Sequence, residues 1–196
     1  PKEVHVKTAL IVVMLAIIVA TPASAQYGTL GVYSEPGGCD CVIEDYQPGL
    51  VSAYVVHRNM VEGVEGARFA VAGTAMPYLV LLDQKPMWHP IRITGSLVDG
   101  YEVFYGGCMY GGMAVVELLF FGQGLTPPCE MIELVAAPTS VTGSVEIFDC
   151  DVNVHAISHS PAFVNNTEGW CYCYDPWCVP VPAEKSTWGS IKAMYR

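Results

Sequence analysis

The stretch Ile91-Arg92-Ile93-Thr94-Gly95-Ser96-Leu97-Val98-Asp99-Gly100-Tyr101-Glu102-Val103-Phe104-Tyr105 determines the class of fold. On both sides of Asp99-Gly100, apolar residues alternate with mostly polar ones. A period of two is typical of a β-strand with one buried face, and Asp-Gly between two such runs is a strong hairpin signal. The stretch therefore predicts two antiparallel strands, 91–98 and 101–106, joined by a tight turn.

The same kind of segment recurs on both sides of this hairpin. Short runs of Val, Ile, Leu, Phe and Tyr are separated by Gly, Pro, Asn or Asp, and no long segment has helical spacing. Met113 to Phe121 is apolar except for Glu117, which favours a central strand covered on both faces, with a short helix as the alternative. The sequence thus predicts an all-β fold, an antiparallel sandwich or jelly roll. The further strands expected are 30–35, 50–58, 64–72, 77–83, 113–121, 130–137, 144–149 and 152–158.

The first 25 residues have the three parts of an export signal. Lys2 and Lys7 supply positive charge, Thr8 to Ala20 is almost entirely apolar, and small residues in an Ala-x-Ala pattern follow. The apolar run is shorter than the roughly 20 residues of a membrane anchor. A buried core helix or an uncleaved anchor is the alternative. We expect a signal-peptide helix over 1–25, a sandwich domain over 26–168, and export out of the cytoplasm.

The charge of the chain excludes two classes of partner. Lys and Arg number 9 against 19 Asp and Glu, which gives a formal net charge of −10. No Lys or Arg occurs between Arg92 and Lys185. Nucleic acids and anionic membranes attract clustered cations, so neither is expected as a partner. An acidic surface suits solubility or, alternatively, weak binding of cations.

The eight cysteines all follow the export signal. An even number of cysteines in an exported chain is typical of a disulfide set, whose pairing the sequence leaves open. The alternative is a metal site, because two pairs of thiols are separated by a single residue, but zinc sites have wider spacing. We expect disulfide bonds and neither a metal nor a cofactor. The cysteines are Cys39, Cys41, Cys108, Cys129, Cys150, Cys171, Cys173 and Cys178.

The C-terminal segment, 169–196, differs from the rest in composition. It begins with a run rich in Cys, Trp, Tyr and Pro, which predicts an irregular, disulfide-pinned segment, and Ser186 could cap a short terminal helix. Aromatic rings held on a rigid loop can stack on sugar rings or anchor a protein contact. Alternatively, the rings cover the disulfides and close a small core. The candidate ligand-binding residues are Trp170, Tyr172, Tyr174 and Trp177.

The strand pattern resembles that of a known class of domain. Gly63 to Val71, the strand Met113 to Phe121 and the strands from Val145 to Ile157 are similar to the pattern of cohesins and related carbohydrate-binding sandwich domains. The resemblance covers most of 26–168 and rests on pattern, without a diagnostic motif. It implies a cohesin-like or immunoglobulin-like sandwich. Those domains lack this number of cysteines, so the resemblance implies the fold more than the partner.

A second resemblance concerns the end of the chain. Ser186-Thr187-Trp188-Gly189-Ser190-Ile191-Lys192-Ala193-Met194-Tyr195-Arg196 is similar to the ending of uncharacterised secreted proteins from environmental bacterial lineages. This resemblance is short and implies no known activity.

No catalytic motif is recognisable. A nucleophilic triad needs Ser or Cys beside a base and an orienting acid, but no Gly-x-Ser-x-Gly turn occurs and bridged cysteines are not nucleophiles. Paired carboxylates could cleave glycosides, although most acidic residues are expected on the surface. We therefore expect no catalytic residues. The histidines are His5, His57, His89, His155 and His159.

Two short patterns resemble metal sites but are incomplete. Asp149-Cys150-Asp151-Val152-Asn153 opens like a calcium loop, whose sixth and twelfth residues should be Gly and Glu. Here these positions hold Val154 and Ser160. In a strand, the polar side chains of 149–153 would instead share one exposed face. His155 and His159 have helical zinc spacing, but their segment is predicted as strand and loop, which favours surface or turn histidines.

Two further motifs have structural explanations. The glycine-rich stretch 105–112 lacks the Lys and the following helix of a phosphate-binding loop, so a loop held by Cys108 is expected. Asn165-Asn166-Thr167 is a glycosylation triplet, relevant only in a host that glycosylates.

Together these features predict a secreted, non-catalytic binding or assembly domain at a cell surface or in an extracellular matrix. Its expected partner is a glycan or an extracellular protein, with oligomerisation possible. Two alternatives stay open: a secreted carbohydrate-active hydrolase, and a structural subunit that polymerises through its exposed edge strands.

Overall fold

The structure, a computed structural model, describes residues 26–166. These residues form strands and contain no helix, and thus no helix among them could cross a membrane. The predicted signal peptide, 1–25, and the predicted C-terminal segment, 169–196, lie outside the described residues. The strands are β1 (Thr29–Tyr33), β2 (Val42–Ile43), β3 (Pro48–Ala72), β4 (Leu79–Pro86), β5 (Arg92–Ser96), β6 (Gly100–Gln123), β7 (Glu130–Val135), β8 (Glu146–Asp149), β9 (Val154–Ala156), β10 (Ser158–Ser160) and β11 (Ala162–Val164).

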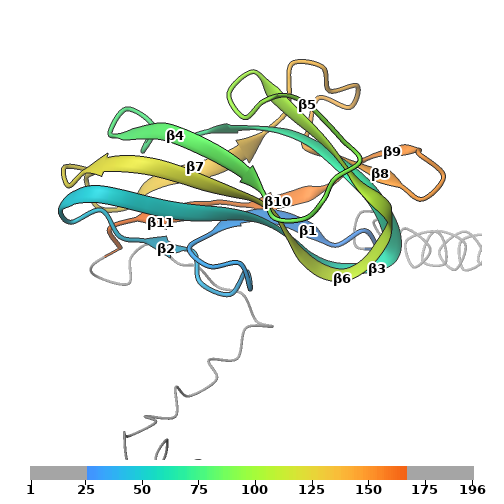
Figure 1. The fold of residues 1–196 in the computed structure, drawn as a ribbon, viewed down its shortest axis with the longest axis horizontal. Coiled ribbons are helices and arrows are strands. Elements are labelled where there is room, and N and C mark those ends of the chain that lie inside the picture. Colours follow the sequence, from blue (N-terminus) through green and yellow to red (C-terminus); the bar gives the residue numbers. More distant parts are fainter. Residues whose placement is uncertain (1–25, 167–196) are drawn as a thin grey trace, which may run out of the picture.

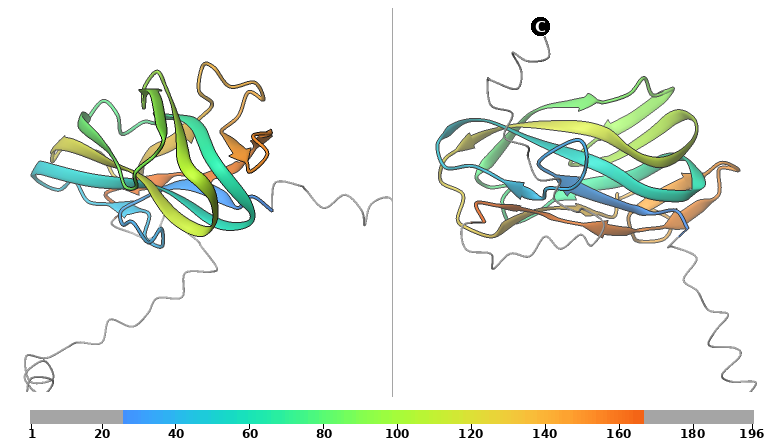
Figure 2. Two further views of the ribbon diagram at one scale, coloured as in Figure 1. Left: turned by 45° about the vertical axis from the view of Figure 1, so that its right-hand side comes forward. Right: turned by 90° about the horizontal axis from the view of Figure 1, so that it is seen from below.

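Two long strands, β3 and β6, run side by side through the molecule (Figure 1). They pair antiparallel along most of their length, starting from Pro48 opposite Gln123. The register shifts repeatedly between Val55 and Gly66, where Asn59 has a positive φ of 57°. Bulges of this kind bend a strand and increase its twist. The pair is therefore curved, as Figure 2 shows from two other directions.

The strands form two layers. In the first layer, β6 pairs with β4 and β5 on one side and with β3 on the other, and β3 continues to β8 and β9. The second layer contains β10, β1, β7, β11 and β2, with β11 between β7 and β2. β3 connects the layers, because β1 pairs with its first half and β7 with its last residues. We call the solvent side of the first layer the outer face.

Every second side chain along the strands points inward, and these side chains fill the space between the two layers. Leu118 and Phe120 of β6, Ile132 and Leu134 of β7 and Leu30 of β1 are fully buried and belong to one hydrophobic cluster. Burying a side chain of this size stabilises a fold by about 1.5–3 kcal/mol. The core thus depends on both layers.

A buried polar cluster closes one end of the sandwich. The Asp45 carboxylate accepts hydrogen bonds from the Thr126 hydroxyl at 2.6 Å and from the Gly124 N–H at 2.9 Å. The Asn165 amide donates to the carbonyl oxygens of Asp45 and Thr126 at 2.9 and 2.7 Å. Polar groups are buried without penalty only when they are paired. This cluster therefore fixes the chain after β2, β6 and β11 relative to one another.

The predicted antiparallel sandwich is confirmed, but the strand boundaries differ. The predicted strands 50–58 and 64–72 form one strand, β3, and 101–106 and 113–121 form another, β6. The stretch 105–112, expected as a loop, is therefore part of β6. Glycines and polar residues separate the apolar runs in the sequence, but pairing between the two strands continues through bulges.

The hairpin predicted from 91–105 is present as β5 and the start of β6. The predicted buried face of its first strand is wrong. Ile91 is 73% and Ile93 39% exposed, because β5 is an edge strand whose one described neighbour is β6. The second strand alternates as predicted, with Tyr101 and Val103 buried.

Residues 150–153 form the turn between β8, which ends at Asp149, and β9, and the interpretation of 149–153 as a strand with an exposed polar face is wrong. Val152 has φ 64°, and its N–H donates to the Asp149 carbonyl at 2.9 Å. The predicted strand 152–158 is reduced to β9 and the start of β10. Asp and Asn favour turns because their side chains bond to the backbone nearby, and here this tendency outweighs the alternation.

Candidate functional site

The outer face carries an apolar row that crosses three strands. Leu50 of β3 lies opposite Phe121 of β6, which lies opposite Val80 of β4. These side chains are 69%, 41% and 51% exposed. They point outward because the neighbours Val51 and Phe120 point into the core. Leu50, Phe121 and Val80 are called the apolar row below, and they form a contiguous exposed apolar strip.

Polar residues border the apolar row on the same face. The next register position places Ser52 opposite Leu119 and Asp83, and the following one places Tyr54 opposite Glu117. The Glu117 carboxylate accepts hydrogen bonds from the Ser52 and Tyr54 hydroxyls, each at 3.4 Å. Burial, and then the nearby Glu117 charge, raise the pKa of Tyr54. Lys85 of β4 lies opposite Glu117, so the border of the row is polar and carries both charges.

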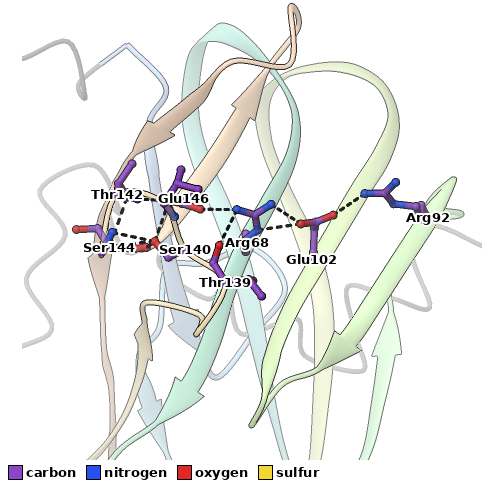
Figure 3. Close-up of polar contacts among 10 residues, drawn as sticks. Arg68, Arg92, Glu102, Thr139, Ser140, Thr142, Ser144 and Glu146 are labelled. Atoms are coloured by element: carbon purple, nitrogen blue, oxygen red, sulfur yellow. Dashed lines mark hydrogen bonds and ion pairs between the residues drawn. The ribbon is translucent and has the colours of Figure 1, made fainter.

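The other half of the outer layer carries a chain of ion pairs (Figure 3). Arg68 of β3 lies between Glu102 of β6, at 2.6 Å, and Glu146 of β8, at 2.9 Å. Glu102 also pairs with Arg92 of β5 at 2.6 Å. Burial raises the pKa of Glu102, but the hydrogen bonds and charges of both arginines outweigh it and lower that pKa. Four strands are thereby joined by charged side chains.

Glu146 is fully buried at the end of this chain of ion pairs. Its second carboxylate oxygen accepts hydrogen bonds from the Ser140 hydroxyl at 2.8 Å and from the two backbone N–H groups that follow, each at 2.6 Å. Burial raises the pKa of Glu146, but these hydrogen bonds from the 140–142 turn outweigh it and lower the pKa. The group is therefore an ionised structural anchor and not a proton donor.

An aromatic stack covers the same part of the layer. The rings of Phe104 and Phe148 stack with centroids 4.8 Å apart, on either side of Gly66, with which both are in register. The Arg68 guanidinium lies 5.0 Å above the Phe148 ring and that of Arg92 4.8 Å above the Phe104 ring. These cation–π contacts occupy both arginines, so this half of the face is built for stability.

His57 is the buried histidine of the described chain. Its Nε2–H donates to the Tyr27 carbonyl oxygen at 2.8 Å, and its Nδ1 accepts from the Tyr105 hydroxyl at 3.3 Å. Burial lowers the pKa of His57 to about 4, against a small opposing effect of the Tyr27 bond. Both nitrogens are occupied and no solvent reaches the ring. This arrangement does not suit a general base, which must reach a substrate.

Asp149, the first residue of the incomplete calcium-loop pattern, uses its carboxylate to stabilise the turn that follows it. The carboxylate accepts hydrogen bonds from the Asp151 and Asn153 backbone N–H groups at 2.9 and 2.8 Å, and from His155 Nε2 at 2.9 Å. Burial raises the pKa of Asp149, but these bonds outweigh it and lower the pKa to about 2. His155 and His159 lie on strands β9 and β10 and not on one helix. Within 26–166 no group of three or more potential ligands could hold a metal.

A groove of about 430 Å³ lies beside the bulged part of the β3–β6 pair. One wall comes from the β1–β2 loop with Pro36 and Gly37, and the other comes from Met60 and Val61 of β3 and the glycines of β6. Arg58 lines the groove as well, and its guanidinium donates to the Gly38 carbonyl at 2.6 Å. This groove, called the loop groove below, is separate from the apolar row.

The described cysteines are in disulfide bonds. Cys108 of β6 is bonded to Cys150 in the β8–β9 turn, with their Cα atoms 5.4 Å apart. Cys39, Cys41 and Cys129 are disulfide-bonded too, and no described cysteine is free. The predicted cysteines Cys171, Cys173 and Cys178 lie outside the described residues.

The predicted ligand-binding residues Trp170, Tyr172, Tyr174 and Trp177 lie outside the described residues, so their use stays a prediction. The glycosylation triplet begins at Asn165, whose side-chain amide lies in the buried cluster with Asp45. In the folded chain this amide is not accessible to a glycan.

The apolar row was not anticipated from the sequence, although a signal for it exists. Leu79 to Leu82 and Phe120-Phe121 are consecutive apolar residues in strands. Because successive side chains in a strand point to opposite faces, such runs put apolar groups on the outer face whenever the inner face is already filled. The same runs also suit strands buried on both sides, so the layer arrangement is needed to distinguish the two.

Solved structures with the same architecture are cohesin modules. The third ScaB cohesin of R. flavefaciens, in complex with a group 1 dockerin, superposes with a TM-score of 0.52 at 10% identity, over 74% of this chain and 98% of that one. The CaDoc0917–CaCohA2 complex gives a TM-score of 0.51 at 10% identity, over 71% and 99%. Neither the family models nor the curated protein sequences give a match. The chain is thus similar to cohesins in fold, which confirms the predicted sandwich.

Proposed function

We propose that this chain is a secreted, non-catalytic docking module that binds a protein partner through the outer face. The apolar row carries the proposal. The largest exposed apolar patch of a soluble protein is often functional, and here Leu50, Phe121 and Val80 are held in register on a sheet. A preorganised surface of this kind binds with little loss of conformational freedom.

The charges around the row indicate the chemistry of the partner. Asp83 and Glu117 lie in the two neighbouring register positions, and Lys85 lies opposite Glu117, which leaves Asp83 as the acidic group nearest the row without a facing cation in that register. Complementary charge steers association and selects partners. The proposed partner therefore presents an apolar ridge, such as one face of a helix, with a Lys or Arg beside it that faces Asp83.

The similar structures support a particular class of partner. The third ScaB cohesin of R. flavefaciens is in complex with a group 1 dockerin, and a dockerin-type module is the first candidate for this chain. Secretion is part of the proposal as well, because disulfides such as Cys108–Cys150 form in oxidising compartments.

The described side chains offer little for catalysis, which supports a binding role. The buried carboxylate Glu146 and its neighbour Glu102 are both paired with Arg68, and His57 has both ring nitrogens bonded. A glycosidase would need two carboxyl groups facing a sugar across a cleft. The ion pairs of Glu102 and Glu146 do not provide this.

The test is site-specific photo-crosslinking on the mature chain. A photoreactive residue at position 121 is compared with one at position 98, since Val98 is also exposed but lies in the β5–β6 turn. We expect purified dockerin modules, or proteins of the source organism's secreted fraction, to be crosslinked from 121 and not from 98, and crosslinking to be lost with Val80→Asp. Equal yields from both positions, or a product containing only a second copy of this chain, would contradict the proposal.

A further inference from the structure

The first residues of β3 have a neighbouring strand on one side only. Residues 48–53 pair with 118–123 of β6. On the other side, β1 runs antiparallel to β3, but it ends where Tyr33 lies opposite Tyr54. Within 26–166, the edge of β3 over 49–53 therefore has no partner strand. The backbone N–H and C=O groups that point away from β6 are unpaired there.

The strand β1 ends because the chain turns away at Ser34. The Ser34 N–H and hydroxyl both donate to the Asp40 carbonyl oxygen, at 2.7 and 3.0 Å. These bonds close the β1–β2 loop at the point where the ladder would otherwise continue opposite Ala53. An extended segment of another chain can therefore take the place of a longer β1 and pair antiparallel with 49–53, which is the mode of binding known as strand addition.

A pocket of about 360 Å³ lies along this edge and is called the edge pocket below. Ser34, Asp40 and Glu44 line it on one side, and Leu50 and Ser52 line it on the side of β3. The loop groove is lined by other residues of the same β1–β2 loop, so the two hollows are distinct. The edge pocket has the size of a small-ligand pocket, which gives room for side chains of a paired segment.

The side chains around the edge pocket select for positive charge. Asp40 and Glu44 are both exposed. One Asp40 carboxylate oxygen accepts the Val42 N–H at 2.9 Å, and none of the Lys and Arg side chains of 26–166 lines the pocket. A Lys or Arg of a bound segment would meet both carboxylates. A second copy of this chain would instead bring its own Asp40 and Glu44 to the same edge, and like charges disfavour that pairing.

Leu50 connects the edge pocket to the apolar row. It is 69% exposed and lies at the β3 end of the row. Side chains directly opposite each other in an antiparallel ladder lie on the same face and in contact, so an apolar residue opposite Leu50 would extend the row by one member. Glu44 follows β2 of the second layer, on the inner side of this edge. Because successive side chains of a strand alternate, the other residues of the segment would point toward the two carboxylates.

We infer that the edge of β3 over 49–53 binds an extended segment as an added strand, with an apolar residue beside Leu50 and a Lys or Arg facing Asp40 and Glu44. The inference rests on the proposed function, because the segment is taken to belong to the partner that covers the apolar row. It gives that partner a second recognition element, an extended stretch in which basic and apolar residues alternate.

Amide hydrogen exchange measured by NMR on the mature protein is the first test. The probe is a blocked peptide of about eight residues in which Lys and Val alternate, the length of an ordinary strand. In the free protein, the amides within 49–53 that face away from β6 are expected to exchange rapidly. The Lys–Val peptide should slow them at least roughly tenfold. A peptide with Glu in place of Lys should not, and neither should a Lys–Val peptide that carries an N-methyl group on every residue.

Removal of the two carboxylates is the second test. Asp40→Asn combined with Glu44→Gln is expected to weaken binding of the Lys–Val peptide roughly fivefold or more, because exposed charge pairs contribute up to about 1 kcal/mol each. Asn retains an oxygen for the Val42 N–H. The matched control combines Glu62→Gln with Asp151→Asn, which removes the same charge from exposed positions outside the edge pocket. The control should bind the peptide nearly as well as wild type.

Protection of every amide in 49–53 in the free protein would show that the edge is already occupied and would overturn the inference. So would failure of the Lys–Val peptide to protect them, equal protection by the comparison peptides, or equal losses in the two double variants, which would indicate attraction by net charge alone. Self-association that protects 49–53 would assign the edge to a second copy. Crosslinking from position 121 reports on the apolar row and exchange at 49–53 reports on the edge, so failure of this inference is distinguishable from failure of the proposed function.

Discussion

Gly63 shows how a single missing side chain permits a covalent bond. A Cβ atom at this position would collide with the sulfur atoms of both Cys108 and Cys150. The disulfide therefore packs flat against the backbone of β3, where only a glycine leaves space.

We expect Gly63→Ala to prevent the Cys108–Cys150 bond from closing without a shift of the backbone. Loss of a disulfide costs about 2–4 kcal/mol, so the unfolding free energy should fall by that order and two thiols should become titratable. Gly107→Ala is the matched control, since nothing lies within 4 Å of a Cβ there. Urea unfolding with a thiol assay measures both effects. A fully oxidised, equally stable Gly63→Ala variant would contradict the prediction.

His57 makes stability depend on pH. Its pKa is lowered by burial from 6.5 to about 4 in the folded protein. Between these values the unfolded chain binds a proton that the folded chain does not, so stability falls as pH falls below about 6.5. One pKa unit corresponds to about 1.4 kcal/mol. We expect the unfolding free energy to be about 2 kcal/mol lower at pH 5 than at pH 7.

Urea unfolding of wild type and His57→Gln at the two pH values tests this. Gln retains hydrogen-bonding groups but does not titrate, so the variant should be less stable at pH 7 yet lose most of the pH dependence. Asp149, Glu146 and Glu102 also have shifted pKa values, which are lowered. These groups change stability mainly when the pH falls below their ordinary pKa values near 4, which lies outside the interval between pH 7 and pH 5. The same slope in both proteins would assign the pH dependence to another group.

At the scale of the strands, the ion-pair chain joins β5, β6, β3 and β8. Removing one partner of a buried pair leaves an uncompensated charge and costs about 3–5 kcal/mol, whereas exposed pairs contribute about 0–1 kcal/mol. Arg68 faces the fully buried Glu146, while the Arg92 side chain is 62% exposed. We expect Arg68→Met to cost about 3–5 kcal/mol at pH 7 and Arg92→Met less than about 1 kcal/mol.

Equilibrium unfolding in urea at pH 7 measures the difference between these variants. Equal costs for the two arginines would mean that solvent, and not Arg68, compensates Glu146.

Individual elements differed in how far the sequence determined them. The hairpin of 91–105 was predictable because Asp99-Gly100 favours a tight turn through the backbone preferences of these two residues, which depend little on the rest of the fold. The exposure of Ile93 was not, since it depends on β5 being at the edge of the sheet. The turn at 149–153 was misread because alternation and turn-forming residues compete within the same five positions.

The candidate site was less predictable than the fold. The sequence drew attention to Trp170 and its neighbours because they are rare and clustered. The apolar row consists of Leu50, Phe121 and Val80, common residues that are far apart in the sequence and meet only through the register of β3, β6 and β4. Such a surface is defined by pairing between distant strands, which composition and spacing do not contain.

At the scale of the whole molecule, the question is whether the two ends of the paired strands β3 and β6 unfold together. Their pairing passes from the apolar row, through the bulged segment between His57 and Gly66, to the ion-pair chain. The bulges interrupt the hydrogen-bond ladder and could divide the sandwich into two units that open separately. However, the core cluster contains residues of both halves, such as Phe120 and Phe69, and the Cys108–Cys150 bond covers the bulged segment beside Gly63.

We therefore expect the two halves to open together. In native-state hydrogen exchange at increasing urea, amides of Val51–Val55 with Val116–Phe120 and amides of Ala67–Phe69 with Tyr101–Val103 should converge on one free energy of opening, because both sets share the same strands and core. The edge strands β5 and β9 should exchange faster, since each has one described neighbour. Reducing the disulfides should lower the shared value without separating the halves. Two distinct opening free energies in the oxidised protein would instead show that the bulged segment is a boundary between independent units.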